Sequence, residues 1–158
     1  MSDVGKRLGQ ANELTVITRI KPGALDVLRQ ILADPALDVP TMFAAIPTVH
    51  YARWTVLQLG GDDADAARLL FSSNYDGTFD HYVAALAATI PAALDKIWSP
   101  CEGWPGEATP EAIRGFITDH AEKAALFYAA YPEATVREVK RALKMQQAVQ
   151  TLFDALQE

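Results

Sequence analysis

Hydrophobic and polar residues alternate in three stretches of the chain, the pattern of strands with one buried face. These stretches, residues 14–20, 50–58 and 68–75, are rich in β-branched and aromatic residues and are followed by turn residues. Elsewhere apolar residues recur every three or four positions, which predicts helices. The predicted helices cover residues 25–32, 79–98, 110–120 and 136–156.

Local signals set the ends of these elements and add one further strand. Pro91 is expected to break or kink the long helix in which it lies. Thr109 followed by Pro110 marks a helix start, and residues 135–138 (TVRE) form a capping-box sequence. Residues 124–131 (AALFYAAY), which end at a proline, are interpreted as a fourth strand.

Reduced to its main elements, the order is βαββαβ, the α+β plan called ferredoxin-like. Right-handed crossovers place the four antiparallel strands in the spatial order 4-1-3-2, with the main helices on one face. An extra short helix and a C-terminal helix complete a single domain over residues 13–158, after a flexible tail at residues 1–12. Residues 36–48 form a long connection, which either covers a cavity or packs on the core.

The strand alternation also predicts which polar residues share the face without helices. Two arginines on one such face suit a carboxylate or another anionic group of a small molecule. The alternative is that both arginines pair with acidic residues at the sheet edge. The candidate ligand-binding residues are Arg19, Arg53, Ser72, Asn74 and Tyr128.

Histidine and cysteine offer fewer options. The three histidines lack the spacing of a metal site. One histidine is enough for a haem, so His50 or His120 is a candidate axial ligand, although a structural histidine explains His50 more simply. Cys101 lies in a loop rich in proline and glycine and is interpreted as structural.

Composition excludes several classes of partner. The 158 residues are 50% hydrophobic and carry a net charge of −6, which supports a folded core and argues against nucleic acid and anionic membranes. We see no stretch of 18 apolar residues that would span a membrane. A single cysteine fits a reducing cytoplasm.

Segments along nearly the whole chain resemble a family of uncharacterised, mainly bacterial proteins of the dimeric α/β-barrel group. The segments are LTVITRIKPG at 14–23, HYARW at 50–54, LLFSSNYDG at 69–77, CEGWPG at 101–106 and FYAAY at 127–131. The resemblance implies a homodimer in which two ferredoxin-like sheets pack face to face. Proteins that share this fold include cofactor-independent monooxygenases, small isomerases and haem enzymes, so activity follows only by analogy.

Together these observations predict a cytoplasmic homodimer that binds a small carboxylated or aromatic molecule against its open sheet face. If it is an enzyme, cofactor-independent oxygenation or isomerisation is the expected class. Two alternatives stay open: a haem protein of the same fold, and a non-catalytic interaction module whose open face is simply an interface.

Overall fold

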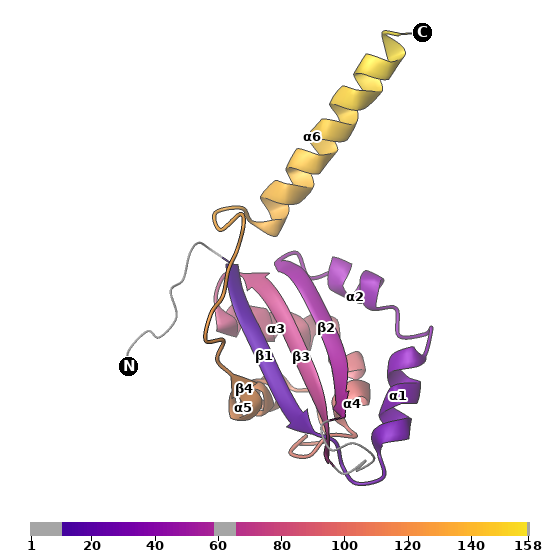
Figure 1. The fold of residues 1–158 in the computed structure, drawn as a ribbon, viewed down its shortest axis with the longest axis vertical. Coiled ribbons are helices and arrows are strands. Elements are labelled where there is room, and N and C mark those ends of the chain that lie inside the picture. The colour runs from indigo at the N-terminus through magenta and orange to yellow at the C-terminus, as the bar shows by residue number, and fades with distance from the viewer. Residues whose placement is uncertain (1–10, 59–65, 158) are drawn as a thin grey trace.

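A four-stranded antiparallel sheet forms the centre of the protein, in a computed structural model that describes residues 11–58 and 66–157 (Figure 1). The strands lie side by side in the order β2-β3-β1-β4. Their bounds are β1 Ala11–Arg19, β2 Val49–Gln58, β3 Ala67–Asp76 and β4 Ala121–Glu122.

Six helices accompany the sheet. Their bounds are α1 Leu25–Ala33, α2 Val39–Ala44, α3 Phe79–Thr89, α4 Pro91–Trp98, α5 Pro110–His120 and α6 Val136–Ala155. The first five lie behind the sheet or at its edges, whereas α6 extends away from it (Figure 1). The helices therefore cover one face of the sheet and leave the other face open, as the sequence predicts.

Burial follows the alternation along the strands. In β1 the buried side chains are Leu14, Val16 and Thr18, and their neighbours in between are only partly buried. The same alternation runs through β3, where Phe71 is fully buried. Phe71 meets the ring of Trp98 edge-on at 5.8 Å between ring centroids. An aromatic cluster thus joins the centre of the sheet to α4.

The starts of α3, α5 and α6 are those that the sequence predicts. The Thr78 hydroxyl accepts a hydrogen bond from the His81 amide at the start of α3. The capping box at the start of α6 is complete, with Thr135 and Glu138 bonded to each other's backbone N–H. Pro91 separates α3 from α4.

The predicted fourth strand is wrong in its position. The strand beside β1 is only Ala121–Glu122, and residues 124–131 have no regular structure. Alanine-rich sequence has weak strand propensity. The partners of β1 at this edge are only Ala121 and Glu122, which pair with Val16 and Thr15.

Two further expectations are settled only in part. Residues 36–48 contain the short helix α2, and Phe43 packs on Trp54 at 5.7 Å between ring centroids, which favours packing on the core over a lid. Ala11 and Asn12 belong to β1 rather than to the predicted tail, whose other residues lie outside the described ones. The predicted turn at residues 60–63 also lies outside them.

The loop at residues 99–106 is fixed to the core by Cys101 and Gly103. Cys101 is fully buried, and its backbone pairs with that of Ile20 in an isolated antiparallel β-bridge. Burial raises the pKa of the Cys101 thiol, in agreement with a structural role. Gly103 has a φ of 79°, and a Cβ there would lie 2.9 Å from Cε1 of His120. Only glycine fits this position.

We expect Gly103→Ala to lower the free energy of unfolding by about 2–4 kcal/mol, from backbone strain plus the clash with His120. Gly106→Ala is the matched control, because Gly106 has a similar φ of 84° but nothing within 4 Å of the added Cβ. Urea denaturation measures both variants. Equal losses for the two would show that the ring of His120 does not constrain this loop.

Candidate functional site

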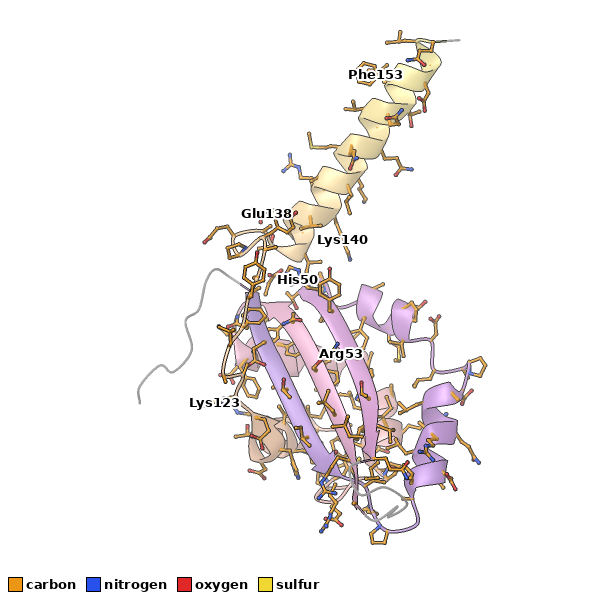
Figure 2. All side chains as sticks on the ribbon, viewed as in Figure 1. His50, Arg53, Lys123, Glu138, Lys140 and Phe153 are labelled. Atoms are coloured by element: carbon orange, nitrogen blue, oxygen red, sulfur yellow. The ribbon has the colours of Figure 1, made fainter. Side chains whose placement is uncertain are left out.

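The open face of the sheet collects polar side chains of three strands. Tyr51 and Arg53 in β2 are exposed, and Ser72 and Asn74 in β3 are partly buried between β2 and β1. Tyr51 is the most exposed, at 76% of its surface. Figure 2 shows Arg53 in the middle of β2 on this face.

The strand register arranges these side chains in rows across the sheet. One row contains Thr15, Ser72 and Arg53, because Ser72 pairs with both of the others. The next row contains Glu13, Asn74 and Tyr51. Neighbouring strands are about 4.8 Å apart, and two residues along a strand span about 7 Å, so the two rows form one compact polar area. We call Glu13, Thr15, Tyr51, Arg53, Ser72 and Asn74 the open-face cluster.

Arg53 is the cationic group of this cluster. Its Nε–H donates a hydrogen bond of 2.9 Å to the Ser72 hydroxyl, which fixes the plane of the guanidinium. Among the ion pairs of the described residues none includes Arg53 or Arg19. Pairing of these arginines with acidic residues, the alternative interpretation, is therefore not seen among the described residues.

The register does not bring all the predicted residues together. Arg19 pairs with Arg68, four residues along β3 from Ser72, which is about 13 Å at the usual rise per residue. Arg19 and Arg53 are therefore too far apart to bind the same small anion. Tyr128 lies in the irregular segment after β4, 77% exposed, so strand alternation no longer assigns it to the open face.

A second polar arrangement lies at one end of the sheet, where the sequence predicts a structural role for His50 but not its partner. Nε2 of His50 lies 2.7 Å from Oδ1 of Asp76, and Oδ2 of Asp76 accepts the Val136 N–H at 2.8 Å. A β-bulge between Val49 and Tyr51 makes His50 the extra residue of β2. A bulge redirects a side chain, and no sequence signal marks this one. Figure 2 shows His50 at the base of α6.

Each candidate haem ligand has one ring nitrogen in a hydrogen bond. In His50 this nitrogen is Nε2, which faces the carboxylate of Asp76. In His120 the Nδ1–H donates to the Phe116 carbonyl at 2.8 Å, and the opposite side of the ring lies against Gly103. The geometry fits structural histidines better than axial ligands, and an absorbance spectrum of the protein tests the haem alternative directly.

Other kinds of site find little support. Among residues 11–58 and 66–157 no group of three or more His, Cys, Asp or Glu side chains is placed to hold a metal ion. A shallow hollow of about 440 Å³ lies at the start of α3, lined by Asn12, Gly77, Thr78, Phe79 and Asp80. Its one charged lining residue, Asp80, is already ion-paired with Arg114.

Comparisons with known proteins add no identification. No protein-family model, no curated protein and no solved structure matches the chain. In the described part of the chain, no helix has the length and apolar character needed to cross a bilayer. Function is therefore inferred from the geometry alone.

Replacing Asp76 tests whether it holds the start of α6. Asp76→Ala should cost about 2–4 kcal/mol of unfolding free energy, because the buried Val136 N–H and the His50 ring both lose their partner. The Val136 amide should exchange with solvent at least tenfold faster, as NMR hydrogen exchange would show. The exposed Asp119→Ala is the control, with a change below about 0.5 kcal/mol. An unchanged exchange rate at Val136 in Asp76→Ala would rule out this anchoring role.

Proposed function

We propose that this chain is a homodimeric protein that binds a small organic anion between two open sheet faces, with Arg53 as the anion-binding residue. The observation that supports this most is the guanidinium of Arg53. It is exposed on a face that no helix covers, and among the described residues it lies beside a hydroxyl rather than a carboxylate.

The chemistry of the open-face cluster fits a carboxylate attached to an aromatic or aliphatic body. The hydrogen bond to Ser72 uses Nε of Arg53. The guanidinium keeps its two Nη groups for a bidentate contact with two oxygens. In the neighbouring row, Asn74 supplies an amide and Tyr51 supplies an aromatic ring. The cluster therefore offers both ends of such a ligand a partner.

A second copy supplies what one chain lacks, a cover for the site. Ile17 and Leu70 form the next row beside the cluster and are only partly buried. Apolar side chains on a bare sheet face favour packing against a similar face, and two packed sheets lie about 10 Å apart. Large polar side chains such as Arg53 and Tyr51 would hold the two sheets further apart at the cluster. The space between the sheets there would admit a small molecule. Oxygenation or isomerisation of that molecule remains a prediction of the resemblance.

Benzoate serves as a simple aromatic carboxylate for a direct test. Benzoate should shift the NMR signal of the Arg53 Nε–H, which the hydrogen bond to Ser72 protects from exchange. Arg53→Ala should weaken benzoate binding at least tenfold, because one charged hydrogen-bonding partner is worth about 1.5–3 kcal/mol. Arg19→Ala is the matched control, and its affinity should stay within about twofold because Arg19 lies outside the cluster.

Native mass spectrometry of the freshly purified protein complements the titration. A dimer that carries extra mass in the wild type but not in Arg53→Ala supports the proposal and allows the ligand to be weighed. Equal benzoate affinity in Arg53→Ala and the wild type contradicts the assigned site. The same holds if the protein has neither extra mass nor a benzoate response. A Soret band in the same sample would favour the haem alternative.

A further inference from the structure

The C-terminal helix α6 has an apolar side that none of the described residues covers. Among its 20 residues only Val136, at the start, is buried. Figure 1 shows α6 extending beyond the end of the sheet. Its exposed apolar side chains are Val139, Leu143, Met145, Val149, Leu152 and Phe153, each at least 40% exposed. Leu156, just after the helix, is 74% exposed.

The start of α6 is built firmly into the body. The N–H of Val136 is bonded to the buried carboxylate of Asp76, and the capping box closes the first turn. A helix of 20 residues is about 30 Å long. Because its first turn is held at the end of β3, the rest of the apolar side points away from the body of its own chain.

Apolar and basic residues of α6 lie on opposite sides of the helix. At 100° per residue, Val139, Leu143, Val149, Phe153 and Leu156 share one side. We call these five residues the α6 stripe. The four basic residues of the helix lie on the opposite side. They are Arg137, Lys140, Arg141 and Lys144.

Helices in proteins take most of their stability from packing of an apolar side. The uncovered α6 stripe therefore favours a partner surface.

Charge favours a second copy of the chain over a lipid surface. The basic residues of α6 occupy only its first half, beside the body, and the distal half carries Asp154 instead. Residues 1–135 hold 17 acidic and 10 basic side chains, so the body is strongly acidic and an anionic membrane would repel it. The five residues of the α6 stripe carry no charge, so the acidic body of another copy does not repel the stripe.

The exposed area is sufficient for a stable dimer. The whole chain exposes 10253 Å², whereas a compact monomer of its 17.2 kDa exposes about 7,800 Å². A standard interface takes about 800 Å² from each partner. This area is about a third of the difference between the two values. Next to α6, the segment after β4 adds Leu126, Tyr128 and Tyr131, each at least 77% exposed.

We propose that α6 is a dimerisation arm, which lies with its stripe against the body of a second copy while the partner's arm lies on the first. Such an exchange is isologous, so both arms are covered in one symmetric dimer. The inference deepens the proposed function and rests on its homodimer, but it uses α6 rather than the open-face cluster. An experiment can therefore contradict the dimerisation arm and leave the anion-binding site intact, or the reverse.

Two double variants of the full chain test the arm. Val149→Glu/Phe153→Glu places two charges on the α6 stripe. Gln147→Glu/Thr151→Glu places the same two charges on the opposite side of the same helix. Light scattering after gel filtration should give twice the chain mass of 17.2 kDa for the wild type and the control. The stripe variant should dissociate to a monomer, with its dimer dissociation constant raised at least 100-fold.

Folding of the variants is measured independently of the mass from light scattering. The three tryptophans all lie in the body, so their fluorescence during urea unfolding reports on the body alone. Tyr51→Glu probes the open sheet face. If it dissociates the dimer and the stripe variant does not, the proposed interface stands and the arm is overturned.

A wild type that is monomeric at every concentration overturns the arm and the homodimer together. Vesicles of phosphatidylcholine with 30% phosphatidylserine test the lipid alternative. Cosedimentation of the wild type with these vesicles, lost in the stripe variant but kept in the control, would overturn the second copy as the occupant. No cosedimentation together with a stripe-dependent dimer supports the proposal.

Discussion

One-sided burial is the constraint on which the rest of the structure depends. The sheet packs one face against its helices around Phe71 and Trp98, and the loop at Cys101 closes that side. Every helix that covers the sheet is used on this face, so the opposite face and α6 keep apolar groups in water. Removing apolar area from water is favourable by about 25 cal/mol per Å². The bare surfaces thus provide the driving force for association that we propose.

The same constraint explains the chemistry of the candidate site. An arginine in a packed core would need a compensating charge, and Arg53 has no carboxylate partner among the described residues. On a face that is open in one chain and covered in a dimer, its charge is available to an incoming anion. Ser72 orients the guanidinium beforehand, which lowers the entropy cost of binding.

The sequence predicts the faces better than the positions. Alternation in residues 14–20 and 68–75 identifies the buried sides of β1 and β3 correctly, because burial on a sheet has a period of two. It does not reveal the register, so it grouped Arg19 with Arg53 although four residues of β3 separate their rows. The bulge at His50 is a two-against-one pairing that depends on β3 and leaves no local pattern.

The C-terminal region shows the same limit. The capping box of α6 was predictable, since it depends on residues three positions apart. Whether residues 124–131 form a strand depends on pairing with β1, and aromatic residues in an alanine-rich stretch do not decide that. Those aromatic side chains are exposed instead, next to an equally exposed α6.

Hydroxyl-radical footprinting of the unmodified protein tests the central claim most directly, because it reports the burial of named side chains in solution. Tyr51 on the open face and Phe153 on α6 are 76% and 57% exposed in a single chain. If a second copy covers both surfaces, the two residues should react at least several-fold slower than in the urea-unfolded chain, and dilution should restore their reactivity together. Rapid labelling of both residues, unchanged between high and low protein concentration, would contradict the claim.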